Sequence, residues 1–235
     1  MPRPAIPMVW KGRAMRVGIV GGTGPAGKAL AVRLAASGAD VLLGSRSAER
    51  GEDVASEVRA AWPAHSLALR GVANAEAAAS DIVVLATPFE GCLEAVLELA
   101  EPLAGRVVVS MINAIARVGK ELQALVPARG SVAATLQSVL PRSSVTAAFQ
   151  HLPAKHLANL DRELRADVFV CADTAEGAEA TAALVDSMSG LRAVHCGSLA
   201  SAGAVEAMTA VLVNVNIRYK SHVAIELTGL RMPGA

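Results

Sequence analysis

Short runs of apolar residues alternate along this chain with longer segments in which apolar residues recur at helical spacing. The runs contain no regular alternation with polar residues, which is typical of strands buried on both faces of a parallel sheet. The clearest run is Ile-Val-Val-Leu-Ala at 82–86. The pattern predicts strands at 15–20, 41–43, 67–72, 82–86, 107–109 and 145–149.

The segments between these strands carry helical patterns, some of them ended by glycine or proline. Helices are predicted from the glycines after residue 20 up to Gly38, and at 48–62, 73–79, 91–103, 118–126 and 132–139. Strands that alternate with helices predict an α/β fold with a doubly wound parallel sheet, because right-handed crossovers place helices on both faces.

Beyond this unit the pattern predicts a smaller α/β extension, with strands at 167–171 and 193–196 around a helix at 175–188. The last stretch, 201–227, predicts a long helix that is apolar on most sides. Such a helix must be buried by the rest of the fold or by a partner chain.

The composition narrows the class of protein. The chain has 235 residues, of which 53% are hydrophobic and 18% charged, and its formal net charge is +1. These values exclude disorder for most of the chain and argue against nucleic acid as the main partner. The mean hydropathy of +0.42 raises the question of a membrane. No continuous apolar run approaches the roughly 18–20 residues of a spanning helix, so we expect no membrane partner and some apolar surface buried in an oligomer.

The spacing of cysteines and histidines predicts neither a disulfide framework nor a metal site. Cys92, Cys171 and Cys196 form no CxxC pair, and the five histidines form no HExxH motif. Residues 1–14 contain three prolines and no signal-peptide pattern. We interpret them as a disordered leader, or as residues upstream of a start at Met15, and we expect a cytoplasmic protein.

The glycine-rich turn after the first strand carries the main candidate chemistry. Gly22, Gly24 and Gly27 form a GxGxxG motif between a strand and a helix, the context in which this motif binds a dinucleotide pyrophosphate. Gly22 would allow the tight turn, Gly24 a close approach of backbone to phosphate, and Gly27 close packing of the helix. Pro25 suits the first helical turn, whose N–H groups face the phosphates. The alternative is a glycine-rich turn without a ligand.

The end of the second strand indicates which dinucleotide is bound. Sheets that bind NAD place an acidic residue there, whereas this chain has Ser45, Arg46 and, one helical turn on, Arg50. A hydroxyl group and two cations suit a 2′-phosphate, which arginine can bind bidentately. NADP is therefore favoured over NAD. The alternative is that both arginines are solvated residues at the start of a helix.

Two further strand ends supply candidates for the nicotinamide side. Thr87, Pro88 and Phe89 follow the strand at 82–86, at the carboxyl edge where ligands of such sheets lie. Pro88 could equally serve only to end that strand. His151, after the last strand, could act as a general acid or base, or be a hydrogen-bonded wall of the pocket. No tyrosine–lysine or lysine–histidine pair is placed for proton transfer to a carbonyl group.

Several motifs together resemble the NADPH-dependent reductases of the deazaflavin coenzyme F420. They are Gly-Gly-Thr-Gly at 21–24, Gly-Ser-Arg at 44–46, Thr-Pro-Phe-Glu at 87–90, Leu-Pro-Ala at 152–154, Ala-Asn-Leu at 158–160, and Val-Glu, Met-Thr and Asn214 in the last helix. The similarity covers residues 15 to about 230, and the segment at 152–160 is its most specific part.

The resemblance implies that hydride passes directly between NADP(H) and coenzyme F420, so that the protein aligns two cofactors and no catalytic side chain is expected. It implies a Rossmann-type NADP-binding domain at 15–150, a C-terminal domain at 151–235 that closes the deazaflavin site, and a homodimer. The implied contacts are Thr23, Gly24, Pro25 and Ala26 for the pyrophosphate; Ser45, Arg46 and Arg50 for the 2′-phosphate; Phe89, Leu93 and Ala154 for the nicotinamide; and Gln150, Leu152, Val211 and Leu212 for the deazaflavin.

Three questions stay open at this point. Family members can carry histidine where Gln150 stands, and one step along a strand changes the face, so either Gln150 or His151 could contact the deazaflavin. An NADPH-dependent imine or carbonyl reductase, with His151 as proton donor, is an alternative function. A non-catalytic NADPH-sensing protein is another.

Overall fold

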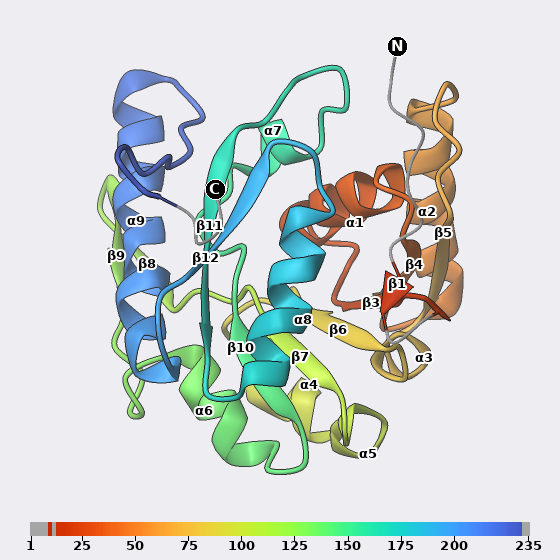
Figure 1. Ribbon diagram of the computed structural model, residues 1–235, viewed down its shortest axis with the longest axis horizontal. Helices are drawn as coiled ribbons and strands as arrows, with labels where there is room; N and C mark the ends of the chain where they lie inside the picture. Colours follow the sequence, from red (N-terminus) through yellow and green to blue (C-terminus); the bar gives the residue numbers. More distant parts are fainter. Residues whose placement is uncertain (1–8, 11–12, 232–235) are drawn as a thin grey trace.

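One eight-stranded sheet runs through the protein, which a computed structural model describes over residues 9–10 and 13–231. The strand order is β12-β11-β10-β7-β6-β3-β4-β5, and every neighbouring pair is parallel except β10 with β11 (Figure 1). The strands are β3 (Arg16–Val20), β4 (Asp40–Ser45), β5 (Leu69–Ala73), β6 (Ile82–Leu85), β7 (Val107–Ser110), β10 (Ser144–Ala147), β11 (Ala166–Ala172) and β12 (Leu191–His195).

Helices cover both faces of this sheet, which confirms the predicted α/β doubly wound architecture. They are α1 (Pro25–Ala36), α2 (Ala48–Ala61), α3 (Asn74–Ala78), α4 (Cys92–Leu97), α5 (Ala100–Leu103), α6 (Val132–Val139), α7 (Ala154–Leu157), α8 (Ala175–Asp186) and α9 (Ala202–Tyr219), with a short 3₁₀ turn η1 at Leu199–Ser201 before α9. One apolar core contains α1, α2, α7 and α8, and the other contains α3, α4, α5, α6 and α9.

Hydroxyl side chains fix where three of the helices begin. Ser47, Ser131 and Thr174 each accept a hydrogen bond from a backbone N–H in the first turn of α2, α6 and α8 respectively. Such caps satisfy N–H groups that have no partner within the helix. Ser47 lies just after β4, at the edge of the sheet where the candidate site lies, whereas Thr174 contacts Ser144 at the start of β10, on the opposite edge.

Two of the predicted helices are wrong in extent or type. The segment predicted as a helix at 118–126 is instead an antiparallel hairpin, β8 (Ile115–Val118) with β9 (Glu121–Ala124). Gly119 has a φ of 61° in its turn, a conformation that favours glycine. The helix predicted at 91–103 is divided into α4 and α5, because Leu99 leaves the helical conformation between them.

The last helix is also shorter than predicted. It ends at Tyr219, where Lys220 has a left-handed backbone conformation with a φ of 49°. The chain then returns along β11, where the N–H of Asp167 donates to the carbonyl of Ile225 at 2.7 Å. The N–H of Leu227 donates to the carboxylate of Asp167, which also pairs with Arg192. The residues after α9 therefore form a hydrogen-bonded tail rather than a helix.

Helix α9 is apolar but only partly buried. By length and composition alone, Leu199–Tyr219 would suffice to cross a membrane, which corrects the expectation that no stretch reaches that length. Core helices of soluble proteins pass the same test, and 28% of this window is buried. The carboxylate of Glu206, which is 4% exposed, accepts the backbone N–H groups of Val132 and Ala133 at 2.8 and 3.1 Å. This contact packs one side of α9 onto the start of α6.

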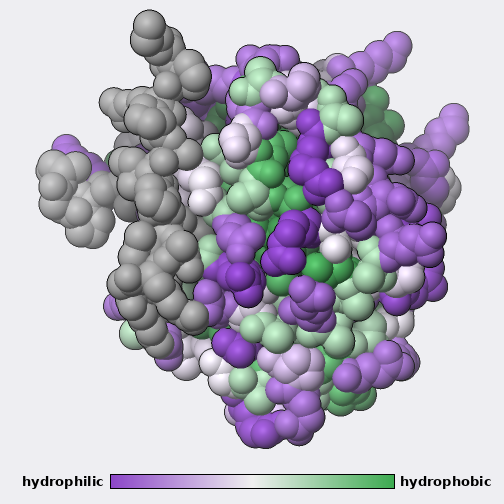
Figure 2. Space-filling view, turned by 90° about the vertical axis from the view of Figure 1, so that its right-hand side faces the viewer, coloured by the Kyte–Doolittle hydropathy of each residue, from purple (hydrophilic) through white to green (hydrophobic). Residues whose placement is uncertain are grey.

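Most of the segment expected to be a disordered leader, residues 1–14, lies outside the described residues. Two short strands of it are described, β1 (Val9–Trp10) paired with β2 (Arg13–Ala14). At one side of the molecule lie α2 and β5, and at the opposite side lie α9 and the β8–β9 hairpin (Figure 1). The side with α2 and β5 has hydrophilic residues around a smaller hydrophobic area (Figure 2).

Candidate cofactor site

A cavity of about 270 Å³ opens at the carboxyl edge of the sheet. It lies where the strand order reverses between β3 and β6, the position at which ligands bind in doubly wound sheets. It is lined by Ala26, Ala86, Thr87, Pro88, Phe89, Glu90, Met111, Ile112, Asn113 and Ile115. Four of the predicted site residues, Ala26, Thr87, Pro88 and Phe89, therefore come together at one cavity.

The glycine-rich turn has the geometry of a phosphate cradle, with one correction to the predicted roles. The positive φ of the tight turn, 71°, falls on Gly21 rather than Gly22. A Cβ on Gly27 would lie 2.8 Å from the Cα of Gly22, so this glycine does allow close packing of α1. A Cβ on Gly24 would meet nothing nearer than 3.7 Å. The space in front of Gly24 is thus open, as a bound pyrophosphate requires.

Helix α1 begins at this turn without a side-chain cap. Gly24 is its N-cap residue, and Pro25 occupies the first helical position. Thr23 and Ala26 flank them at the mouth of the turn and are both accessible. Uncapped N–H groups at the start of a 12-residue helix offer hydrogen-bond donors and the positive end of the helix dipole to an anion. The residues present therefore fit a dinucleotide pyrophosphate.

Asn74, which the sequence analysis did not single out, holds the glycine-rich turn in place. It is the first residue of α3 and follows β5 directly. Its Oδ1 accepts the N–H of Gly21 at 3.1 Å, and a Cβ on Gly44 would lie 2.8 Å from the same oxygen. The only signal in the sequence is a polar residue just after the third strand, which does not reveal a partner 53 positions away.

The end of β4 presents two free guanidinium groups. Ser45 is buried, whereas Arg46 and Arg50 are exposed and form no ion pair or side-chain hydrogen bond among the described residues. Ser47 caps α2 by accepting the N–H of Arg50. The nearest acidic residue along the chain, Glu49, is exposed in the first turn of α2. Two unpaired cations suit a phosphate better than a ribose hydroxyl.

Gln150 belongs to a buried polar network between the sheet and α9. Its Nε2 donates to the carbonyl of Ser110 at 3.0 Å, and its Oε1 has no partner. Its carbonyl oxygen accepts from Asn113, which lines the cavity, and from Thr209 of α9. Thr209 also donates to Asn113 at 3.1 Å. Gln150 therefore lies beside the cavity with a free acceptor, and Asn113 and Thr209 are further site candidates.

A strained residue directs Gln150 and His151 to different neighbours. Phe149 is 1% exposed and has a φ of 72°, which is uncommon for a bulky residue. After this turn Gln150 contacts β7, whereas His151 contacts β11. The alternation of side chains along a strand therefore does not apply to Gln150 and His151, because the strand β10 ends before them, at Ala147.

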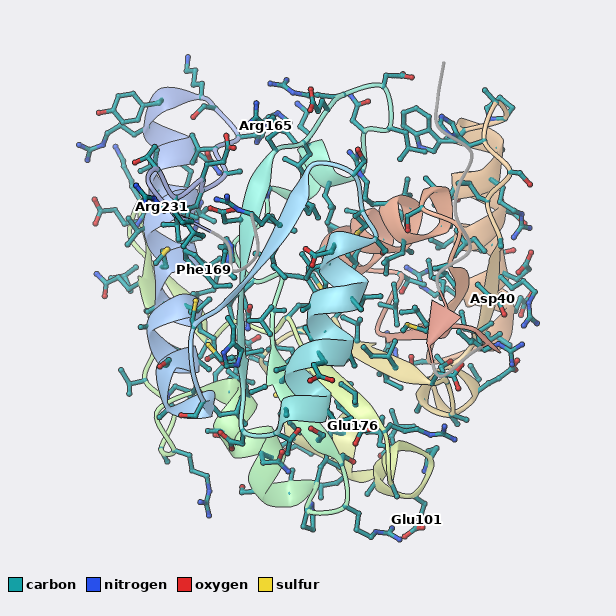
Figure 3. The ribbon with its side chains drawn as sticks, viewed as in Figure 1. Asp40, Glu101, Arg165, Phe169, Glu176 and Arg231 are labelled. Carbon is teal, nitrogen blue, oxygen red and sulfur yellow. The ribbon has the colours of Figure 1, made fainter. Side chains whose placement is uncertain are left out.

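His151 is buried and its one proton is engaged. It is 3% exposed, and its ring lies 5.0 Å from that of Phe169 on β11, which faces α9 (Figure 3). Its Nε2 lies 2.9 Å from the carbonyl of Asp167, so Nε2 must carry the proton and donate it. Burial lowers the pKa of His151, which favours this neutral form. The geometry is that of a hydrogen-bonded wall and gives no support to a proton donor.

The remaining predicted residues, Leu93, Leu152, Ala154, Val211 and Leu212, are not among those that line the cavity. Leu93 and Phe89 are half-buried against the core that contains α4 and α9. Leu152 and Ala154 pack against the core that contains α1, on the other face of the sheet. Leu212 is half-buried on α9, and Val211 is 60% exposed. The structure thus brings Phe89 and Gln150 near the cavity and leaves Val211 at the surface of the single chain.

A second, more open hollow of about 610 Å³ lies at the amino ends of β4 and β5. It is lined by charged residues that already bond to the edge strand: Arg59 donates to the carbonyl of Leu69, and Glu52 accepts the N–H of Gly71. Asp40, at the start of β4, lies across the molecule from Phe169 (Figure 3). Because parallel sheets bind ligands at their carboxyl edge, we assign the cofactor site to the smaller cavity.

The described residues contain no group of three or more histidine, cysteine or acidic side chains placed to hold a metal ion. All three cysteines are free. Burial raises the pKa of the Cys171 thiol to about 12, so this cysteine is not a reactive thiolate.

A doubly wound sheet with an open glycine-rich turn at its switch point defines a Rossmann-type dinucleotide-binding protein. Residues 16–114 match the family model described as NADP oxidoreductase, coenzyme F420-dependent. The chain is 34% identical to the F420-dependent NADP reductase of Methanocaldococcus jannaschii, over 93% of this chain and all of that one. It is 30% identical to the reductase of the same name from Methanothermobacter thermautotrophicus, over 92% and 96%. The chain belongs to the coenzyme F420-dependent NADP oxidoreductase family.

The fold agrees with a crystal structure from Arthrobacter sp. FB24, provisionally described as an F420-dependent NADP reductase. That structure superposes with a TM-score of 0.76 at 23% identity, and the match covers 91% of this chain and all of the other. At this identity the likeness supports the fold alone, and it extends through the C-terminal strands and α9 as well as the dinucleotide-binding half.

Proposed function

We propose that this protein is an F420-dependent NADP reductase, which transfers hydride directly between NADP(H) and the deazaflavin coenzyme F420. The observation that carries this proposal is the full-length similarity to curated reductases of that name, which extends past the dinucleotide-binding half into α9. The open phosphate cradle and the cavity at the switch point give that activity a site.

For the NADP half we propose contacts at two loops. Thr23, Gly24, Pro25 and Ala26 hold the pyrophosphate at the start of α1, where N–H groups are uncapped. Ser45, Arg46 and Arg50 hold the 2′-phosphate at the end of β4. The two guanidinium groups are free to bind it, since neither is paired within the described residues.

For the two reacting rings, we propose that the nicotinamide lies against Thr87, Pro88, Phe89, Leu93 and Ala154. The deazaflavin would lie against Gln150, Leu152, Val211 and Leu212. The network of Gln150 with Thr209 supports this division, because it connects α9 to the edge of the cavity. We further propose that residues 151–235 close the deazaflavin side.

When both cofactors are bound, the deazaflavin and the nicotinamide supply the hydride chemistry themselves. The protein's part is then to hold the two rings in contact and to exclude water from them. Thr87 and Gln150 each carry a buried oxygen without a partner, which can bind polar groups at the ring edges. His151 is not placed to supply a proton to the rings, because it donates its proton to the backbone carbonyl of Asp167.

The experiment that tests this function mixes the purified protein with NADPH and oxidised coenzyme F420. The expected result is loss of the deazaflavin absorbance, together with NADPH oxidation in a one-to-one ratio. Oxidation of NADPH by imines or ketones, with none by the deazaflavin, would instead make the protein a carbonyl or imine reductase. Tight NADPH binding without turnover of either substrate would make it a sensing protein.

We also propose a cytoplasmic homodimer without a membrane or nucleic-acid partner. Six of the nine large hydrophobic side chains exposed among the described residues lie on α9 or at the hairpin and the residues just after it. They are Val118, Leu125, Val126, Val211, Ile217 and Tyr219. A second copy of the chain would cover these exposed apolar side chains. The three unbridged cysteines are compatible with a reducing compartment.

A further inference from the structure

A buried arginine on α1 has no acidic partner. Arg33 is 9% exposed, and among the described residues it forms no ion pair with a carboxylate. Buried arginines are rare unless their charge is balanced. Burial lowers the pKa of Arg33, yet a guanidinium group stays protonated in proteins. A full positive charge is therefore held inside the fold for a purpose that the NADP contacts do not explain.

The charge is balanced by backbone carbonyl groups of one short segment. Nε of Arg33 donates to the carbonyl of Leu157 at 3.0 Å. Nη2 donates to the carbonyls of His156 at 2.9 Å and Asn159 at 2.7 Å, and the carbonyl of Arg162 lies 3.5 Å from Nη1 and Nη2. The guanidinium group thus contacts the carbonyl groups at the end of α7 and in the turns that follow it.

Helix α7 depends on this contact, because it cannot be stable alone. It has four residues and no side-chain cap at its start. A single helical turn fixes several residues for very few hydrogen bonds, so isolated turns of this length do not persist. The carbonyls at its end carry negative dipole charge, which a cation stabilises. Arg33 fixes their position by donating from three nitrogens that share one plane.

Arg33 joins the two halves of the proposed site. It lies on α1, whose first turn is the proposed pyrophosphate site. Its partners follow Gln150, Leu152 and Ala154, which we have proposed as contacts of the two rings. The segment at 152–160 is also the part of the chain most specific to the family resemblance, and its carbonyl groups are what Arg33 binds.

We infer that Arg33 is a positioning residue, which sets the segment 150–160 relative to α1 and thereby aligns the deazaflavin with the nicotinamide for hydride transfer. This inference rests on the proposed function. The arginine touches neither cofactor and acts through α7. Its loss should therefore impair the hydride step while leaving the NADPH contacts at Ser45 and Arg46 intact.

The test compares Arg33→Met and Arg33→Lys with Arg59→Met as a matched control. Arg59 also donates to a backbone carbonyl, that of Leu69 at 2.7 Å, but at the amino edge of the sheet. We expect Arg33→Met to lower kcat by roughly tenfold to a hundredfold, the effect of a small misalignment of reacting groups. The deuterium isotope effect with NADPH labelled at the transferred position should rise, because hydride transfer becomes the slow step. The dissociation constant for NADPH should stay within about twofold.

The lysine variant keeps the charge but not the planar set of donors, so its kcat should fall between wild type and Arg33→Met. It also serves if the methionine variant does not fold. Arg59→Met should leave both kcat and the isotope effect unchanged. A wild-type kcat and isotope effect in a folded Arg33→Met or Arg33→Lys protein would overturn the inference.

Hydrogen exchange gives a readout that needs no substrate. The amides of residues 154–162 should lose protection in Arg33→Met and keep it in Arg59→Met. Unchanged protection in Arg33→Met would show that Arg33 does not hold the segment, and the inference would be wrong. If the wild-type protein does not reduce the deazaflavin, the proposed function and the alignment role both fail. Exchange then decides only whether Arg33 anchors α7.

Discussion

At the scale of single residues, the site is defined by groups that the fold leaves without partners. Within the described part of the chain the guanidinium groups of Arg46 and Arg50 have no partner, whereas Arg16, Arg59, Arg142 and Arg192 are paired with carboxylates. The oxygens Thr87 Oγ1 and Gln150 Oε1 are buried without a donor. Unpaired buried polar groups cost free energy, and these two oxygens lie at the carboxyl edge of the sheet, where a ligand would complete them.

Arg46 should decide the choice of nucleotide. Arg46→Ala should raise the KM for NADPH with little effect on NADH, because only NADPH carries the 2′-phosphate. A charge-assisted contact contributes roughly 1.5–3 kcal/mol, so the wild-type preference should exceed tenfold. Initial rates with both nucleotides measure this, and Glu49→Gln, at the exposed residue next to Arg50, is the control. Equal use of the two nucleotides by the wild-type protein would contradict the assignment.

His151 should matter for stability and position but not for proton transfer. His151→Ala should cost at most about 2 kcal/mol in transition-state stabilisation, through loss of positioning. A loss of several thousandfold in kcat, with both cofactors still bound, would instead favour a carbonyl reductase that uses this histidine as its acid.

The pH dependence of stability provides a second measurement on the same residue. Burial holds the pKa of His151 below its usual value of about 6.5, so the unfolded chain binds the proton more readily. The stability contributed by neutral His151 is therefore present above about pH 6.5 and is lost as the pH falls through the folded-state pKa. Thermal unfolding of wild type between pH 8 and 5 should show a steeper loss than His151→Gln. His156, whose pKa is also lowered, is common to both proteins.

At the scale of elements, the sequence was sufficient where a local pattern decides the structure. The strand at 82–86 and the helix at 132–139 follow from a continuous apolar run and from helical spacing, and both are found where predicted. The hairpin at 115–124 was missed because its residues also fit helical spacing. Its stability comes from contact with a helix about 90 positions away in the sequence, which periodicity cannot reveal.

Asn214 of α9 is that distant contact. Its side-chain amide donates to the carbonyl of Leu122 and accepts the N–H of the same residue, both at 2.8 Å. The amide thus pairs with β9 as a neighbouring strand would. Because two isolated strands are marginally stable in water, the hairpin should depend on this anchor. The first strand, β8, begins at Ile115, which lines the cavity.

Replacing Asn214 by leucine should release the hairpin. Trypsin should then cut faster after Arg117 and Lys120, which flank the turn, and the rate of cleavage measures how often the hairpin opens. Asn216→Leu is the control on the same helix, since Asn216 binds the backbone of Val223 and not the hairpin. Equal resistance of the Asn214→Leu protein and wild type would show that apolar packing alone holds the hairpin against α9.

At the scale of the whole molecule, the two predicted domains, 15–150 and 151–235, are built on one sheet. Residues before and after position 150 contribute to a single sheet, because β10 pairs with β11, and to the same apolar core on the α1 side. The sequence predicted both sets of strands but not their junction. The chain leaves β10 through Phe149, which has a φ of 72°, a conformation that no residue type in that position signals.

The exposed apolar side chains of α9 bear on how the whole molecule associates. The sequence predicted that α9 would be covered on nearly every side, whereas in the single chain Val211, Ile217 and Tyr219 are 60%, 48% and 71% exposed. Apolar side chains that the chain itself leaves this exposed indicate cover from outside it. The buried carboxylate of Glu206 shows that the first turns of the helix are held by the fold. In our proposal, a second copy of the chain covers these side chains.

Sedimentation of the wild-type protein at micromolar concentration should therefore show a dimer. Ile217→Asp should dissociate it, because an unpaired charge would enter an apolar interface. Ile217 is exposed in the single chain, so the variant should fold. Leu97→Asp, at a 53% exposed position on α4, is the matched control and should remain dimeric. If α9 both closes the deazaflavin side and forms the interface, turnover should fall with dissociation in Ile217→Asp. A wild-type monomer with full activity would show instead that α9 completes the site within one chain.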